Sequence, residues 1–160
     1  MSLSSHQNTV GKSNNWFTPP WIFEKLGKFD LDPCTSENRP WDIAKHNTTS
    51  DGLAIKWWGR VWLNPPFNRY EVGKWMAKMA IHNNGIMLVA ARTETQNFYN
   101  YVWGRCSGVL FVKNRPHFCD EKGIPAKLNS GAPICLVAYG DYDLQVLLNS
   151  NLGTVVKEIR

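Results

Sequence analysis

The stretch Arg60–Phe67, with the sequence RVWLNPPF, sharply narrows the folds open to this chain. Arg60–Leu63 is apolar after its first residue and predicts a buried strand. Two adjacent prolines follow at positions 65 and 66, and neither has an N–H to donate to a sheet ladder. The chain therefore has to leave the sheet at Asn64 in a stiff, extended turn. Open α/β sheets bind ligands at exits of this kind, at the carboxyl ends of their strands.

This turn, Asn64–Phe67, presents three chemical groups in fixed relative positions, and we call it the tetrad. The Asn64 side chain both accepts and donates hydrogen bonds, the carbonyl before or at Pro65 is a free acceptor, and Phe67 offers an aromatic face. A planar exocyclic amino group needs two acceptors for its hydrogens and a ring to stack against its base. By average residue usage the pattern arises by chance in roughly one chain in a thousand of this length. A functional role is therefore favoured over a merely rigid turn.

The composition is that of a globular protein. Of the 160 residues, 43% are hydrophobic and 19% are charged, which excludes a disordered chain, and the length suits one domain. The sequence contains no run of 18 apolar residues and no apolar stretch behind a basic start, so we expect neither a membrane span nor a signal peptide. We expect residues 1–14 to be a disordered tail and residues 15–160 to form a single domain.

Cysteine usage and net charge indicate the environment and the kind of partner. Cys34, Cys106, Cys119 and Cys135 form no CxxC pair, so we expect reduced, mostly buried thiols in a cytoplasmic protein. His117 and Cys119 are too small a set for a zinc site, and no metal is expected. The net charge of +5 and the isoelectric point of about 9.1 are compatible with a polyanionic partner.

Apolar strand patterns alternate with helical patterns along the chain. The predicted strands cover 29–32, 60–63, 86–91, 109–112, 132–139 and 154–159. One predicted helix begins after Thr18, which is expected to be its N-cap. The other predicted helices cover 70–82, 95–102 and 143–149. These elements predict a compact α/β fold of reduced Rossmann type, with a mostly parallel sheet. Strands 109–112 and 132–139 have no helix between them and are expected to pair antiparallel at one edge.

Two connecting segments show neither the hydrophobic periodicity of a helix nor that of a strand. Residues 35–59 are expected to form a long, aromatic-rich connection that wraps a ligand, and residues 115–130 to form a loop or an interrupted hairpin. On the predicted helix 70–82, Lys74 and Lys78 lie on a face that is expected to be solvated.

Three polar strand exits are expected side by side at the carboxyl edge of the sheet: Asp32–Cys34, the tetrad and Arg92–Thr95. The acidic first exit suits the amine or the ribose hydroxyls of a cofactor. The tetrad suits the amino group of a base. The third exit offers Arg92 and threonine hydroxyls, which suit either contact with a substrate phosphate or a role in shaping the pocket.

In this order, the motifs of the chain resemble those of the phage-type DNA adenine-N6 methyltransferase (Dam) family. The resemblance extends from about Trp16 to the last strand. Its pieces are W-F-T-P-P at 16–20 with Ile22 and Phe23, L-D-P-C at 31–34 with Glu37 and Asn38, D-G-L at 51–53 with Trp57, V-W-L-N-P-P-F at 61–67, Trp75 and Lys78, A-R-T-E-T at 91–95, Arg115 and Phe118, and residues 130–139.

The resemblance implies an S-adenosylmethionine-dependent enzyme that methylates the N6 amino group of adenine in DNA. It implies catalytic roles for Asn64, Pro65, Pro66 and Phe67. It also implies a cofactor site that includes Thr18, Asp32, Pro33, Cys34, Glu37 and Asp51. Basic residues near the same edge are candidates for contact with DNA, namely Arg69, Lys74, Arg92 and Arg115. The implied setting is the cytoplasm of a bacterial host that is infected by a phage or carries a prophage.

Two departures from common methyltransferase patterns leave alternatives open. The first predicted strand is followed by Cys34–Glu37 with no glycine-rich loop, and the tetrad begins with Asn and ends with Phe. Asn and Phe keep the acceptor and the stacking face. The alternatives are an inactive module that binds S-adenosylmethionine or DNA, and a methyltransferase for RNA or for protein amide nitrogen. The intact tetrad favours an enzyme, and the basic charge favours nucleic acid.

Overall fold

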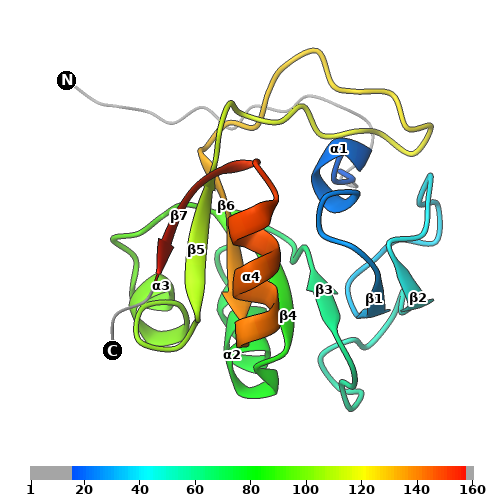
Figure 1. Cartoon of the computed structure of the whole chain (residues 1–160). Helices are drawn as coiled ribbons and strands as arrows, with labels where there is room; N and C mark the ends of the chain where they lie inside the picture. Colours follow the sequence, from blue (N-terminus) through cyan, green and yellow to red (C-terminus); the bar gives the residue numbers. More distant parts are fainter. Residues whose placement is uncertain (1–15, 158–160) are drawn as a thin grey trace.

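The structure, a computed structural model, describes residues 16–157; the expected tail at 1–14 lies outside this range. The described residues form a seven-stranded sheet in the order β2-β1-β3-β4-β6-β5-β7 (Figure 1). The strands are β1 (Phe29–Asp32), β2 (Ala44–Asn47), β3 (Val61–Leu63), β4 (Gly85–Ala90), β5 (Gly108–Val112), β6 (Ile134–Tyr139) and β7 (Gly153–Lys157). The helices are α1 (Pro20–Phe23), α2 (Val72–His82), α3 (Gln96–Tyr101) and α4 (Asp141–Asn149).

The sheet is parallel on one side and antiparallel on the other, which confirms the predicted fold class. Strands β2, β1, β3 and β4 pair in parallel, whereas β6 is antiparallel to both of its neighbours, β4 and β5. Strand β5 therefore runs in the same direction as the parallel group, and β7 pairs with it in the opposite direction. The carboxyl ends of β1, β2, β3, β4 and β5 consequently lie at one edge of the sheet, which we call the carboxyl edge.

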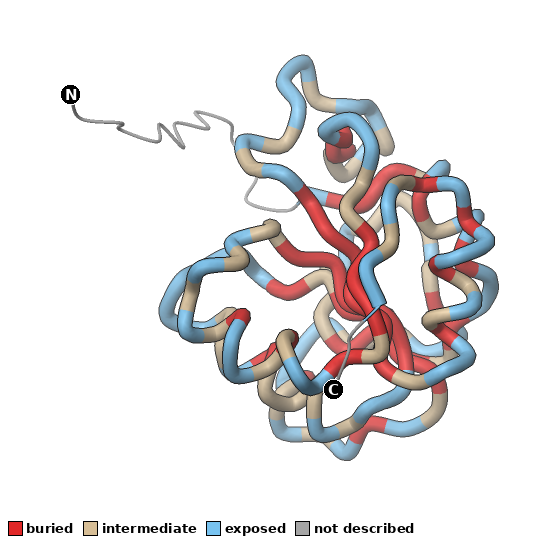
Figure 2. Tube along the Cα trace, turned by 60° about the vertical axis from the view of Figure 1, so that its left-hand side comes forward, coloured by how far each residue is buried: buried red, intermediate tan, exposed pale blue. Residues whose placement is uncertain are grey.

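Helices cover both faces of the sheet. Alternate strand residues enter two cores: Val61 and Leu63 join the side chains of α2 and α3 on one face, whereas Trp62 joins those of α1 and α4 on the other. Figure 1 shows α4 in front of the sheet, and Figure 2 shows the buried residues concentrated along the central strands. Because the central parallel strands are buried on both faces, they read in the sequence as continuous apolar runs.

A buried ion pair ties α4 to the start of β3. Arg60 donates from Nε to Asp143 Oδ1 over 2.8 Å and from Nη1 to the Lys28 carbonyl over 2.8 Å, and its guanidinium lies 4.0 Å from the centre of the Phe29 ring. Both partners are almost fully buried. Removing either one would leave the other charge buried and unpaired, a costly state for a folded protein.

Three local predictions were wrong. Residues 35–59 were expected to contain no strand, but they contain β2. Its sequence AKHN has no apolar pattern, because only Ala44 is buried. Thr18 is not the cap of α1, since Pro19 occupies the N-cap and no side chain caps the helix. Lys78 is not solvated: its ammonium donates to the carbonyls of Leu53 and Ile55 over 2.6 and 2.5 Å.

All four cysteines are free thiols, and only Cys34 is more than slightly accessible. No helix within residues 16–157 is long and apolar enough to cross a membrane. In the same part of the chain, no group of three or more His, Cys, Asp or Glu side chains is placed to hold a metal ion.

Candidate active site

The carboxyl edge brings the three predicted strand exits together. Strand β3 pairs with β1 on one side and with β4 on the other, so Asp32, Asn64 and Arg92 leave the sheet from three neighbouring strands. The connection from β5 to β6, residues 113–133, begins at the same edge because β5 runs in the same direction. The carboxyl edge is thus the polar end of the sheet, as expected for the ligand side of an open α/β fold.

The tetrad begins directly after β3. Asn64 is half-buried and Pro65 is buried, whereas Pro66 and Phe67 are exposed. Within residues 16–157, no hydrogen bond reaches the Pro65 carbonyl or the Oδ1 atom of Asn64. The two acceptors that an amino group would need are therefore free in this part of the chain. The Phe67 ring is 46% exposed, so one of its faces can receive a base.

Thr18 approaches the tetrad from a distant part of the sequence. Its Oγ1 accepts a hydrogen bond from Asn64 Nδ2 over 3.3 Å, and the threonine is 1% exposed. The backbone of the preceding residue, Phe17, exchanges hydrogen bonds of 2.9 and 2.8 Å with Cys119. The segment before α1 is therefore held between the tetrad and the β5–β6 connection.

The β5–β6 connection also supports the aromatic end of the tetrad. The Phe118 ring meets the Phe67 ring edge to face, with centroids 6.5 Å apart and an interplanar angle of 82°. Phe118 is buried and its carbonyl accepts from the Ala126 N–H over 2.8 Å. Phe67 thus has a buried ring behind it and an open side in front.

A small cavity of about 100 Å³ lies between the ends of β1 and β2. Its wall consists of Pro33, Cys34, Thr35, Thr48, Thr49, Ser50, Asp51, Gly52 and Trp75. Gly52 is required there, since an added Cβ would lie 1.8 Å from the Pro33 carbonyl oxygen and 2.9 Å from Trp75 Cη2. Asp51 has a left-handed backbone, with φ of 52°, and turns the chain into this wall.

Burial controls the charge state of the β1 exit. Burial raises the pKa of Asp32 to about 7, although the Cys34 N–H that donates to its Oδ1 over 3.0 Å and the charge of Arg39 act in the opposite direction. Burial, together with the negative charges of Asp32 and Glu71, raises the pKa of the Cys34 thiol to about 12. Cys34 is therefore a neutral thiol near pH 7, whereas Asp32 can be ionised by a nearby cation.

The residues around this cavity fit part of a nucleoside cofactor that carries an amino acid. A ribose diol and an ammonium group need anionic or carbonyl acceptors, and Asp51 supplies one in the cavity wall. Asp32, buried at the end of β1, precedes this wall in the chain and does not line it. A carboxylate needs donors, which the hydroxyls of Thr35, Thr48 and Ser50 supply. The cavity alone is smaller than usual ligand pockets, which are on the order of 300–1,000 Å³. The remainder of such a cofactor would have to extend along the carboxyl edge toward Thr18 and Asn64.

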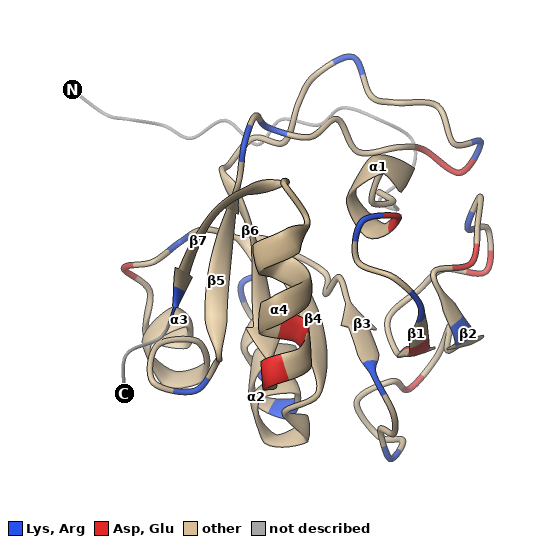
Figure 3. Ribbon diagram, viewed as in Figure 1, with Lys and Arg blue, Asp and Glu red and all other residues tan. Residues whose placement is uncertain are grey.

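The other candidate residues are less closely grouped. Glu37 is exposed and does not line the cavity. The four basic candidates, Arg69, Lys74, Arg92 and Arg115, are exposed. Arg69 lies beside the tetrad, and its guanidinium lies 4.6 Å from the centre of the Tyr70 ring. Figure 3 shows further basic positions along the β5–β6 connection above the sheet.

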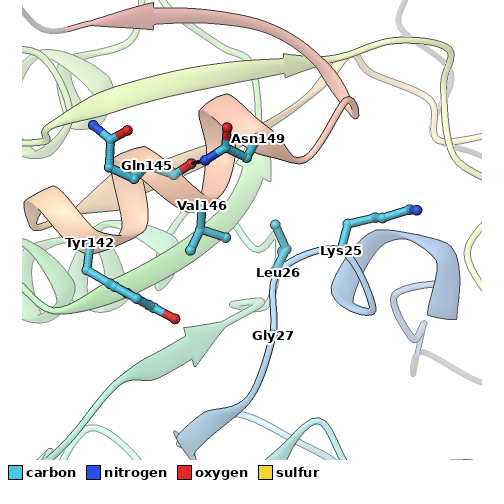
Figure 4. A pocket seen from close by; sticks show the side chains of 7 residues that line it. All are labelled: Lys25, Leu26, Gly27, Tyr142, Gln145, Val146 and Asn149. Atoms are coloured by element: carbon cyan, nitrogen blue, oxygen red, sulfur yellow. Dashed lines mark hydrogen bonds between the residues drawn. The ribbon is translucent and has the colours of Figure 1, made fainter.

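A larger hollow of about 370 Å³ lies elsewhere, between α4 and the segment that enters β1. Figure 4 shows Tyr142 and Val146 of α4 facing this segment at Leu26. None of its lining residues belongs to the tetrad or to the strand exits. It is therefore separate from the candidate active site.

Sequence reasoning missed several contributors to the site. Trp75 of α2, which was named among the family motifs without a role in the site, forms part of the cavity wall. Thr48 and Ser50 belong to the exit of β2, which was missed together with its strand. Phe118 meets the tetrad across 51 positions of sequence, and no local pattern signals such a pairing. A recognisable signal existed only for β2, whose polar run T-T-S-D-G resembles the other strand exits.

An α/β sheet that is parallel on one side and antiparallel on the other, a polar cavity at its carboxyl edge and an Asn-Pro-Pro-Phe turn at the end of β3 are consistent with a methyltransferase-like domain of reduced Rossmann type. Comparison with known families is more specific. The chain belongs to the DNA N-6-adenine-methyltransferase (Dam) family, whose model matches residues 5–142.

A curated relative from Escherichia phage T1 is described as a DNA N-6-adenine-methyltransferase. It is 34% identical to this chain over a 107-residue alignment, which covers 55% of this chain and 43% of the relative. The chain thus matches less than half the length of that relative. A comparison with solved structures finds no significant match.

Proposed function

We propose that the chain transfers a methyl group from S-adenosylmethionine to the N6 amino group of adenine in DNA. The observation that carries this proposal is the position of the tetrad in a Dam-family chain: Asn64 and Pro65 directly follow the parallel strand β3, and their two acceptor oxygens are free within residues 16–157. We further propose that residues 15–160 form a single methyltransferase domain. A DNA substrate and four free thiols support a cytoplasmic setting, in a bacterium that hosts a phage or prophage.

The tetrad has the groups that this reaction needs. The lone pair of an aromatic amine is delocalised into the base and is a poor nucleophile. If Asn64 Oδ1 and the Pro65 carbonyl accept its two hydrogens, the nitrogen is drawn toward tetrahedral geometry. The same two oxygens stabilise the positive charge that develops on this nitrogen during methyl transfer. The transfer would break the S–CH₃ bond, whose electron pair would leave with S-adenosylhomocysteine, and the methylated amine would release one proton to water. Because this cationic amine is acidic, no strong general base is needed.

Phe67 would receive the target base. An adenine inside a duplex cannot reach the tetrad without leaving its stack, which costs a few kcal/mol. The half-exposed Phe67 ring, supported from behind by Phe118, offers a replacement stacking surface. Pro66 would keep this ring at a fixed distance from Asn64, because its φ angle is restricted.

S-adenosylmethionine would supply an electrophilic methyl group on a sulfonium. We propose that the cavity walls at Pro33, Cys34 and Asp51 hold one part of it, and that Asp32 faces a cationic or hydroxyl group of the cofactor. Thr18 is joined to the tetrad by its hydrogen bond with Asn64. Glu37, being exposed and outside the cavity wall, is the weakest member of the proposed set.

DNA would approach the carboxyl edge. We propose that Arg69, Lys74, Arg92 and Arg115 contact its phosphates, because all four are exposed and lie on segments that leave this edge. Such contacts position a duplex without reading its sequence. Lys78 does not belong to this set, since its ammonium is already bound by two backbone carbonyls.

The proposal is tested by incubating the pure protein with methyl-labelled S-adenosylmethionine and duplex DNA, single-stranded DNA or RNA. Digestion to nucleosides then identifies the methylated base. We expect N6-methyladenine from DNA. If the labelled methyl group is found in RNA, in protein or in another base, the substrate is not adenine in DNA. Cofactor binding without methyl transfer to any of these molecules would indicate an inactive binding module.

A further inference from the structure

The hydroxyl of Thr18 is committed to Asn64 and not to the helix that follows it. Threonine before a proline-initiated helix usually caps that helix, but α1 begins one residue later and has Pro19 at its N-cap. Thr18 is 1% exposed, and the hydrogen bond that its Oγ1 accepts from Asn64 Nδ2 spans 46 positions of sequence. This hydrogen bond joins the first described segment of the chain to the centre of the candidate active site.

The segment around Thr18 is rigid on both sides. Before it, Phe17 forms a two-hydrogen-bond bridge with Cys119. After it, Pro19 and Pro20 restrict the backbone, and Ile22 is completely buried. The Thr18 backbone is therefore held in place independently of Asn64, so its hydroxyl can orient the asparagine side chain.

Orientation matters because the two ends of an asparagine amide have opposite hydrogen-bonding character. The Nδ2 end only donates and the Oδ1 end only accepts, whereas the amino group of adenine presents two donors. With Nδ2 facing Thr18, Oδ1 is left as the acceptor for the target. A half-turn of the amide would place its NH₂ group against the target amino group, donor facing donor.

We propose that Thr18 is a positioning residue that holds the Asn64 amide with its oxygen toward the target amino group. This inference rests on the proposed function and adds a role that cofactor binding does not require. When the hydroxyl donates its own hydrogen to a bound molecule, only its lone pairs face Asn64, and these accept only from the Nδ2 end. Thr18 therefore couples the segment before α1 to the orientation of the catalytic acceptor.

The kinetic test compares Thr18→Val, which has nearly the same shape without the hydroxyl, with Thr18→Ser, which restores it. At saturating cofactor and DNA, Thr18→Val should lower turnover by about fivefold to tenfold, the population shift that one net hydrogen bond controls. Thr18→Ser should recover most of the loss. Thr154→Val, on the exposed strand β7, is the matched control for removing a threonine hydroxyl. Equal turnover of Thr18→Val and the parent protein would overturn the proposal.

A second comparison separates positioning from cofactor binding. A carboxylate has two equivalent oxygens and no donor end, so Asn64→Asp leaves no amide orientation to control. Thr18→Val should then cost less than about twofold in the Asn64→Asp background, against the fivefold to tenfold loss in the parent. A loss of equal size in both backgrounds would show that Thr18 acts through the cofactor or through folding, and would overturn the positioning role.

An NMR measurement tests the Thr18–Asn64 hydrogen bond without relying on activity. The Asn64 side-chain NH₂ resonances, identified by their absence from the Asn64→Ala spectrum, should move in Thr18→Val and remain close to their parent positions in Thr18→Ser. Unchanged resonances in Thr18→Val would overturn this hydrogen bond. If the parent methylates no nucleic acid while these resonances respond as expected, the proposed function fails and the Thr18–Asn64 hydrogen bond stands.

Discussion

Phe67 lies edge to face against Phe118, with ring centroids 6.5 Å apart. One ring belongs to the turn that ends β3, and the other to the connection between β5 and β6. Phe118 is buried and Phe67 is half-exposed, so the pair joins the hydrophobic core to an open surface at the carboxyl edge. The position of the stacking ring therefore depends on a segment far from it in the sequence.

Replacing Phe67 by alanine should weaken methylation of duplex DNA more than methylation of unpaired DNA. The substitution removes a stacking surface worth on the order of 1–3 kcal/mol for a base that has left its stack. A mispaired or single-stranded adenine needs less unstacking work, so its rate should fall less. Phe67→Tyr should retain activity, and Tyr99→Ala is the control for losing an exposed ring. Equal losses on paired and unpaired adenine would argue against a stacking role.

Gly52→Ala should weaken cofactor binding and lower thermal stability. The added methyl would overlap the Pro33 carbonyl at 1.8 Å, and relieving this overlap would move the cavity wall at a cost of about 1–3 kcal/mol. Gly131→Ala is the matched control, because nothing lies within 4 Å of its added Cβ. Calorimetric titration with S-adenosylmethionine and thermal unfolding of both variants check this. If Gly52→Ala behaves like Gly131→Ala, the wall does not shape a cofactor site.

Asp32 should make the free energy of unfolding depend on pH. Its pKa of about 7 in the folded protein lies above the value of about 3.9 in unfolded chains. Between these values the folded protein binds more protons, so the free energy of unfolding should fall as pH rises from about 4 to 7. Asp32→Asn should reduce the total decrease in the free energy of unfolding over this pH range by up to about 4 kcal/mol. Urea unfolding at several pH values measures it. Burial also raises the pKa of Asp143, so part of the slope should remain.

Asp141→Asn, an exposed carboxylate on α4, is the control for this measurement. Asp32→Asn should also weaken the binding of S-adenosylmethionine, because the neutral side chain no longer attracts a cationic group. An unchanged slope in Asp32→Asn would show that Asp32 is ionised in the folded protein. If Asp32→Asn binds S-adenosylmethionine as tightly as the parent protein, the cofactor site does not include the end of β1.

DNA binding should weaken steeply as salt rises. Each protein–phosphate ion pair adds close to one unit to the slope of log affinity against log salt concentration. Alanine at Arg69, Lys74, Arg92 or Arg115 should therefore lower the slope by about one for each phosphate that the variant no longer binds. Lys28, exposed at the opposite edge of the sheet, supplies the control Lys28→Ala. Fluorescence anisotropy with labelled duplexes measures the slopes, and a flat response to salt would argue against a nucleic-acid substrate.

Sequence patterns predicted the elements whose residues are buried in a regular order. Strand β1 was located from its alternation of apolar and acidic residues, and strands β3 and β4 from apolar runs that are buried on both faces. Helix α2 was located from its apolar stripe, which includes Trp75, Met76 and Met79. Strand β2 was missed because Lys45 and His46 are exposed, so the strand carries no apolar period. The cap assigned to Thr18 failed because the following prolines keep the chain extended for one more residue.

The candidate site could be predicted from the sequence only in part, because some of its contacts join distant segments. Polar residues at strand ends predicted the grouping of Asp32, Asn64 and Arg92, since parallel neighbours share an edge. The hydrogen bonds that orient the site join distant segments, as Thr18 does with Asn64 and Phe17 with Cys119. Such pairings depend on the path of whole connections, which local periodicity does not encode.

The most direct measurement is the steady-state rate of N6-methyladenine formation in DNA by the parent protein and by Asn64→Ala. Asn149→Ala, on the exposed side of α4, is the control. Losing one oriented acceptor at the reacting nitrogen should lower turnover by about tenfold to a thousandfold, with little change in cofactor affinity. A parent that forms N6-methyladenine and an Asn64→Ala variant impaired to this extent are the predicted result. An Asn64→Ala variant that methylates adenine as fast as the parent would contradict the catalytic role of the tetrad.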